Sequence, residues 1–146
     1  MPPGNLGSAS FTERPQQGTE TFQVEVKTLH QLFQEHQFKD ARLIKLDVED
    51  WEAEVVEGAE ESWSERPPPA IIFEFRESKL ISETEVGRRL AHLGYRFYRI
   101  PRNWLRPQLV RSDAGFSSKV THDVFAVHES ISCEKLGFTS SQVIES

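Results

Sequence analysis

The chain has 146 residues, the size of one domain, and 37% of them are hydrophobic, which is enough to build a core. The net charge of -6 argues against nucleic acid as a partner, because proteins that bind it gather lysine and arginine on one face. The single cysteine, Cys133, excludes an internal disulfide and a thiol cluster for zinc. No apolar run is long enough to span a membrane and the first residues carry no secretion signal, so we expect a cytoplasmic protein without a membrane partner.

The amino-terminal part is predicted to begin with a loop-like lead-in over residues 1–21, which are rich in Gly, Pro, Ser, Gln and Thr and show no sustained period. Val24 and Val26 then alternate with polar residues, a pattern that predicts a half-exposed strand. Thr28 and Gln31 have the spacing of a capping box, so a helix is expected to begin at this point.

The middle of the chain predicts a strand, a helix and a second strand. Leu43–Leu46 is a short, mostly apolar run that suits a strand buried on most of both faces. Apolar residues recur at helical spacing over 51–63, with Asp50 as the natural N-cap and the glutamates on a solvated face. The apolar run Ala70–Phe73 follows as a strand that ends at Glu74, which completes a βαβ unit.

The later part of the chain predicts a further helix and two more strands. Ser82 and Glu85 have the spacing of a capping box, so a helix is expected to begin there. Gly94 is suited to end this helix in a left-handed conformation. Strands are expected over 95–100 and 124–127, and no clear helix separates them, so the last strand should be antiparallel. The fold class is therefore an open α/β sheet, largely parallel, with an antiparallel strand at its end.

Acidic residues follow both apolar strands, where ligands bind in open α/β sheets. Asp47 and Glu49 follow the first strand and Glu74 ends the second. If the strands are neighbours, these carboxylates converge and could accept a proton, orient a substrate or face a positively charged ligand. A structural interpretation stays open beside this one, because Lys45 or Arg76 could simply neutralise Glu74 and because Asp47 could serve structure alone.

Residues 43–59, which read L-I-K-L-D-V-E-D-W-E-A-E-V-V-E-G-A, resemble the signature of the FkbM methyltransferase family, approximately L-K-I-D-V-E-G-x-E-x-x-V-L-x-G-A. The resemblance implies a Rossmann-like class I methyltransferase sheet and S-adenosylmethionine as the cofactor. By position it implies that Asp47, Glu49 and Glu74 line the site where the methyl donor and a small-molecule acceptor meet. It also implies methyl transfer to oxygen, on a small molecule or a sugar-type acceptor.

The resemblance covers only the second half of the family's domain, and the glycine-rich turn that holds the methyl donor in the family has no counterpart in the sequence. We therefore expect a truncated methyltransferase-like domain over 22–128, followed by a tail over 129–146. A non-catalytic remnant or interaction module that does not bind the donor is the alternative. The strand at Leu43–Leu46 should then expose an edge that pairs with another copy, recruits the lead-in or aggregates.

Two residues depart from the family pattern. Asp50 stands where the signature has glycine, and it could cap a helix equally well, whereas a ligand that must approach the backbone there would meet its side chain. His30 stands where the family's T-L-D segment has its acid, which is expected to remove a carboxylate from the neighbourhood of the site.

Overall fold

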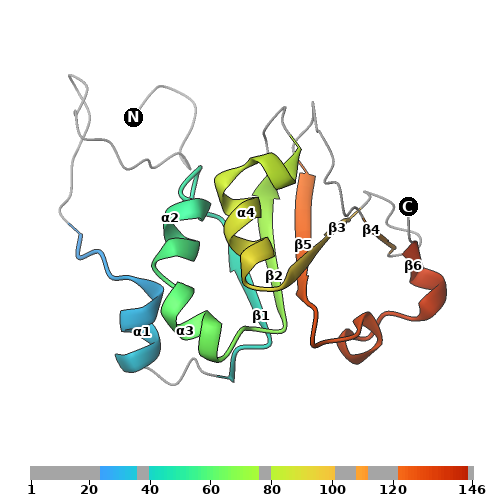
Figure 1. Cartoon of the computed structure of the whole chain (residues 1–146), viewed down its shortest axis with the longest axis horizontal. Coiled ribbons are helices and arrows are strands. Elements are labelled where there is room, and N and C mark those ends of the chain that lie inside the picture. The colour runs from blue at the N-terminus through green and yellow to red at the C-terminus, as the bar shows by residue number, and fades with distance from the viewer. Residues whose placement is uncertain (1–23, 36–39, 76–79, 101–107, 112–121, 145–146) are drawn as a thin grey trace, which may run out of the picture.

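A computed structural model describes residues 24–35, 40–75, 80–100, 108–111 and 122–144 (Figure 1). These residues form a six-stranded sheet with the order β1-β2-β5-β3-β4-β6. The strands are β1 (Leu43–Leu46), β2 (Ala70–Phe75), β3 (Tyr95–Arg99), β4 (Leu109–Arg111), β5 (His122–His128) and β6 (Val143–Ile144). The α-helices are α1 (Leu29–Glu35), α2 (Glu52–Glu57), α3 (Glu60–Glu65) and α4 (Glu85–His92). Within this part of the chain no helix has the length and apolar character needed to cross a membrane.

The sheet has a mixed pattern of strand directions. β1 and β2 are parallel neighbours, and β5 lies between β2 and β3 and runs antiparallel to both. The α/β class and the antiparallel last expected strand are thus confirmed, although this strand lies inside the sheet. The expectation of a largely parallel sheet is not, because three of the five strand pairings in the described sheet are antiparallel. β4 and β6 complete the sheet as a parallel pair that the apolar pattern did not reveal, because each has at most three residues.

The core is divided between the two faces of the sheet, because side chains on a strand alternate. Ile71 and Phe73 of β2 belong to a cluster with Trp63 of α3 and Leu90 of α4, all of them buried. Ile72 points to the other face and packs against a second cluster, which is covered by partly buried side chains of the chain after β5. The side chains that cover the second cluster are those of Ile131, Cys133, Leu136, Phe138 and Val143.

The capping box predicted at the start of α1 is confirmed. The Oγ1 atom of Thr28 accepts a hydrogen bond of 3.1 Å from the backbone N–H of Gln31, and the backbone N–H of Thr28 donates one of 2.9 Å to Oε1 of Gln31. The left-handed stop after α4 is also confirmed, since Gly94 has a φ of 84°. Both features are local, so a few neighbouring residues suffice to specify them.

Two expectations about strands were wrong. Val24 and Val26 are 65% and 77% exposed and form no strand, because their segment pairs with none of the described strands. An alternation of apolar and polar residues forms no strand unless the backbone pairs with another strand. Leu43 is 53% exposed, so β1 is not buried on most of both faces. The reason is its place at the edge of the described sheet.

The single helix expected over 51–63 is broken into α2 and α3 at Gly58 and Ala59. Trp51 lies just before α2 with non-helical dihedrals and is 45% exposed, so it does not join the buried face that Trp63 occupies. Asp50 does not cap the helix either, because Trp51 holds the N-cap position and no side chain there makes a capping bond.

Arg89 of α4 joins the helices on this face of the sheet. Its guanidinium lies 3.1 Å from a carboxylate oxygen of Glu57, 2.7 Å from one of Glu60 and 3.0 Å from one of Glu85. The glutamates of 51–63 were expected on a solvated face, but Glu57 and Glu60 instead connect α2 and α3 to α4. Arg89 is only 22% exposed, so water screens these ion pairs less than it would on an open surface.

Thr84, rather than Ser82, begins α4. Residues Ile81–Glu83 form a 3₁₀ turn before it, which moves the helix start two residues beyond the expected cap. The buried Oγ1 atom of Thr84 accepts a hydrogen bond of 3.1 Å from the N–H of Gly87 and donates one of 2.7 Å to the carbonyl oxygen of Ile81. The turn therefore packs directly on the first turn of the helix.

We predict that Gly87→Ala destabilises the protein by at least about 2 kcal/mol, because overpacking against backbone atoms leaves no room to relax. A Cβ atom at residue 87 would lie 1.8 Å from the carbonyl oxygen of Ile81. Urea unfolding should measure the loss, and Ala91→Ser, at an exposed position of the same helix, should cost only about 0.5 kcal/mol. Equal effects of the two substitutions would contradict the described packing of the 3₁₀ turn on α4.

Candidate active site at the carboxyl ends of β1 and β2

Acidic residues meet where the first two strands end. Leu46 of β1 is paired with Phe73 of β2 in parallel register, and the next residues along the two strands are Asp47 and Glu74. Because the strands are parallel neighbours (Figure 1), both acids lie at the same end of the sheet. The two acids thus lie at the carboxyl ends of adjacent parallel strands, as expected, although β2 continues one residue beyond Glu74, to Phe75.

These acids lie on the face of the sheet opposite to the helices. Leu46 and Phe73 belong to the cluster under the helices, so Lys45 and Glu74, one position away, face the other side. Lys45 donates a hydrogen bond of 2.7 Å from Nζ to Oδ2 of Asp47, two residues further on. Both side chains of this ion pair are more than half exposed, so it adds little stability.

Asp123 adds a further carboxylate from a distant part of the chain. It lies on β5 directly opposite Glu74 in the antiparallel register. Hydrogen bonding to Asp47, and then the negative charges of Asp47, Asp123 and Glu74, raise the pKa of the Lys45 ammonium. Asp123 was not predicted as a site residue, because nothing near it in the sequence shows that β5 inserts beside β2.

Glu52, at the start of α2, lies near the same group. Burial raises the pKa of its carboxyl, hydrogen bonds with the backbone of Glu52 and Val48 oppose this shift, and the negative charges of Asp50 and Glu74 add to it. Glu52 was expected on the solvated face of the helix, although it matches the second glutamate of the signature. We call Asp47, Glu52, Glu74 and Asp123 the acidic edge.

Glu49 and Asp50 form the turn between β1 and α2. Their φ angles are 51° and 73°, in the left-handed region that favours glycine, which gives a physical reason for the glycine of the signature at position 50. Glu49 is exposed on this turn. The structure thus brings Asp47 and Glu74 to one face and leaves Glu49 on the adjoining turn.

His30 does not belong to the acidic edge. Its Nδ1 atom lies 2.8 Å from Oγ of Ser62 on α3, and its Nε2 atom lies 3.6 Å from a carboxylate oxygen of Glu61. The expectation that an acid at position 30 would join the carboxylates near Asp47 was therefore wrong. His30 connects α1 to α3 instead.

The model of the methyltransferase FkbM domain matches the chain over residues 2–97. The chain belongs to this family. No match was found among curated proteins or among solved structures. The FkbM domain match includes Asp47, Glu52 and Glu74, and it ends within β3, so Asp123 lies beyond it.

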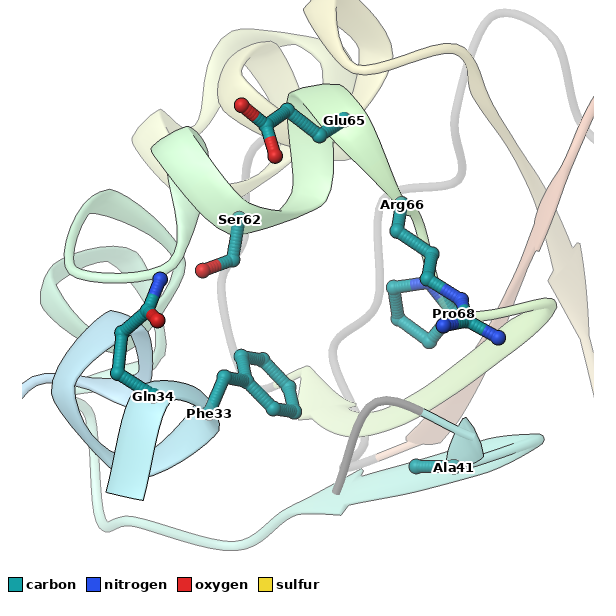
Figure 2. A pocket seen from close by; sticks show the side chains of 7 residues that line it. All are labelled: Phe33, Gln34, Ala41, Ser62, Glu65, Arg66 and Pro68. Carbon is teal, nitrogen blue, oxygen red and sulfur yellow. The ribbon is translucent and has the colours of Figure 1, made fainter. Parts of the chain in front are cut away.

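Two cavities lie away from the acidic edge. The first, of about 130 Å³, is shown in Figure 2 between α1, α3 and the residues that precede β1 and β2. It is lined by Phe33, Gln34, Ala41, Ser62, Glu65, Arg66 and Pro68. The second, of about 400 Å³, includes Arg96, at the start of β3, and His128, at the end of β5. Both therefore lie toward the amino ends of the parallel strands, whereas the acidic edge lies at their carboxyl ends.

No metal-binding cluster was found among the residues that the structure describes. Within those residues, no group of three or more His, Cys, Asp or Glu side chains has an arrangement that could hold a metal ion.

We predict that Asp50→Gly stabilises the protein by about 1 kcal/mol, because glycine adopts a positive φ without the cost that a Cβ atom brings. The matched control is Asp50→Ala, which removes the same charge and keeps the Cβ atom. Urea unfolding of both variants isolates the backbone contribution. If Asp50→Ala proved as stable as Asp50→Gly, the gain would come from charge and the left-handed turn would not be its cause.

The raised pKa of Glu52 predicts a dependence of stability on pH. The folded protein holds the proton of Glu52 to higher pH than the unfolded chain, so ionisation of this group opposes folding. We expect Glu52→Gln to be more stable than the wild type at pH 7, and the difference to vanish as pH falls below the ordinary value of 4.5. Urea unfolding from pH 4 to pH 7 should show this, and Glu54→Gln, at an exposed position of α2, controls for the loss of one charge from the same helix.

Proposed function

We propose that the chain acts in methyl transfer from S-adenosylmethionine to an oxygen atom of a small-molecule or sugar-type acceptor, and that it supplies the acceptor side of the site. The observation that carries this proposal is the placement of Asp47 and Glu74 at the ends of adjacent parallel strands in a chain of the FkbM methyltransferase family. The carboxyl ends of parallel strands are where ligands bind in Rossmann-like sheets.

The arrangement of charge supports a functional role for the acidic edge. Glu74 and Asp123 lie directly opposite each other on antiparallel strands, and like charges in that position are destabilising. The adjoining turn holds Glu49 and Asp50 at positive φ, which is a further local cost. Places where a sequence departs from the locally stable choice are expected at functional sites.

The side chains of the acidic edge fit a positively charged ligand. S-adenosylmethionine, when bound, supplies an electrophilic methyl group on a positively charged sulfur. Asp47, Asp123 and Glu74 all raise the pKa of the Lys45 ammonium, so their negative charge stabilises a cation placed near them. Lys45 holds Asp47 in place through its hydrogen bond.

The carboxylates can also act on the acceptor. A carboxylate of Asp47 or Glu74 would accept a hydrogen bond from the acceptor hydroxyl, orient it, and take its proton as the new oxygen–carbon bond forms. Glu49, on the adjoining turn, is the third acid that the family resemblance implies. Glu52 is the acid whose pKa is raised toward the working range of a general base.

A non-catalytic methyltransferase-like module is the second candidate. Two observations favour it: the 146 residues show no counterpart of the glycine-rich turn that holds the methyl donor in the family, and Asp47 is already paired with Lys45 at 2.7 Å. In that case the acidic edge would serve contacts with other molecules, and the chain would not bind S-adenosylmethionine by itself.

Calorimetric titration with S-adenosylmethionine and S-adenosylhomocysteine separates these candidates. We predict that the wild type binds S-adenosylmethionine about fivefold more tightly than S-adenosylhomocysteine. Only the former carries a positive charge on its sulfur, which is worth about 1 kcal/mol beside one carboxylate in water. The double variant Asp47→Asn/Glu74→Gln should lose this preference. The matched control is Asp40→Asn, which removes an exposed acid before β1, at the end of the strand opposite to Asp47. This variant should keep the preference for S-adenosylmethionine.

The outcomes are distinct. If a folded chain gives no heat and no thermal shift with either ligand, the enzyme proposal fails for this polypeptide and the non-catalytic candidate stands. If both ligands bind equally well to the wild type, donor binding does not use the charge of the acidic edge, and the roles given to Asp47 and Glu74 are wrong.

A further inference from the structure

The second cavity lies between the sheet and the chain that follows β5. Arg96 and Tyr98 of β3 and Val127 of β5 line it from the sheet. Arg96 is paired with Val127 and lies two positions before Tyr98, so all three side chains are on the face opposite to the helices. Residues 128–133 and Lys135 form its other side. The volume of about 400 Å³ is within the range of about 300–1,000 Å³ that is usual for ligand sites.

The lining of this cavity carries more positive than negative charge. Arg96 and Lys135 are its two basic side chains, and Glu129 is the acid among its described residues. No carboxylate in the described part of the chain forms an ion pair with Arg96 or Lys135. Glu134, next to Lys135, accepts a hydrogen bond of 2.8 Å from Oγ of Ser140 instead. In a chain with a net charge of -6, this excess of positive charge favours an anionic ligand.

Tyr98 adds a buried hydroxyl group to the lining without adding charge. Its side chain is part of the second core cluster, and the residue is 7% exposed. Burial and then a hydrogen bond with Cys133 raise the pKa of Tyr98 to about 12, and the positive charges of Arg111 and Arg96 oppose this shift. The hydroxyl therefore keeps its proton at neutral pH. The effect of Arg96 on Tyr98 also indicates that the guanidinium lies near this hydroxyl.

Backbone hydrogen bonds hold the far side of the cavity in place. The N–H of Lys135 donates a hydrogen bond of 3.0 Å to the carbonyl oxygen of Ser132, and the guanidinium of Arg42 donates one of 3.3 Å to the carbonyl oxygen of Lys135. The N–H of Ser130 donates one of 3.3 Å to Nδ1 of His128. The backbone that carries Lys135 is thus fixed before a ligand arrives, which lowers the entropic cost of binding.

We propose that this cavity binds a small phosphate monoester, with the phosphate group between Arg96 and Lys135 and the organic part against Val127 and Ile131. A phosphate monoester carries a charge of about -1.5 to -2 at pH 7, so it gains more from two cations than a carboxylate does. The fork of N–H groups on a guanidinium also matches phosphate oxygens.

The proposed phosphate site is separate from the acidic edge. The cavity lies toward the amino ends of the parallel strands, and the acidic edge lies at their carboxyl ends. This inference goes beyond the proposed function and does not rest on it, because it uses neither the methyl donor nor the carboxylates of the acidic edge. The two proposals can therefore fail independently.

Calorimetric titration at low ionic strength tests the ligand class. The probes are glycerol 3-phosphate, inorganic phosphate, acetate and glycerol. We expect glycerol 3-phosphate to bind at least about threefold more tightly than inorganic phosphate, because its organic part covers apolar lining, and to bind at least about fivefold more tightly than acetate. Glycerol alone should give no binding heat.

Charge-neutralising variants test the position of the site. We expect Arg96→Gln and Lys135→Gln each to weaken the binding of glycerol 3-phosphate at least about fivefold, and Glu129→Gln to strengthen it about threefold. Arg99→Gln is the matched control, since Arg99 is an exposed arginine of the same strand on the opposite face, and it should leave the affinity unchanged. Circular dichroism should show that all four variants are folded.

Several results would overturn the phosphate site. A folded chain that gives no heat with glycerol 3-phosphate removes it, as does an Arg99→Gln variant that loses as much affinity as Arg96→Gln. Acetate binding as tightly as glycerol 3-phosphate would make the ligand a carboxylate. Inorganic phosphate binding as tightly as the monoester would show that the organic part makes no contact, and would contradict the role given to Val127 and Ile131.

Discussion

The parallel pairing of β1 with β2 is the contact on which the candidate site depends. Its register sets Leu46 against Phe73, and the acids Asp47 and Glu74 come next on the two strands. A shift of β2 by one residue would turn Glu74 into the apolar cluster beneath the helices and Phe73 out of it. The buried side chains of β2 therefore fix the position of a carboxylate that is itself not needed for the core.

The fold was predictable from the sequence where a few neighbouring residues determine the structure. The capping box at Thr28, the apolar strands and the left-handed Gly94 are of this kind. The strand expected around Val24 was not, because a strand exists only with a partner, and partners are chosen by the whole chain. The break between α2 and α3 likewise escaped the helical pattern, since an apolar period continues across it.

The candidate site was predictable in part for the same reason. Asp47 and Glu74 follow apolar strands in a recognisable signature, whereas Asp123 reaches them through the insertion of β5 between β2 and β3. That insertion depends on tertiary packing and left no mark near Asp123 in the sequence. The signature also contains Glu52, but its proximity to Glu74 becomes visible only once α2 is placed above the end of β1.

Arg89 has a consequence for how the helices can move. One guanidinium bridges glutamates from three helices, with Glu57 at the end of α2, Glu60 at the start of α3 and Glu85 at the start of α4. A displacement of any one helix strains contacts to the other two, so thermal motion of this layer should be collective. Because Glu52 begins α2, motion of the helix layer would move this carboxyl group together with α4. Concentrated salt screens the ion pairs of Arg89, so it should make the motions of α2 and α4 more independent.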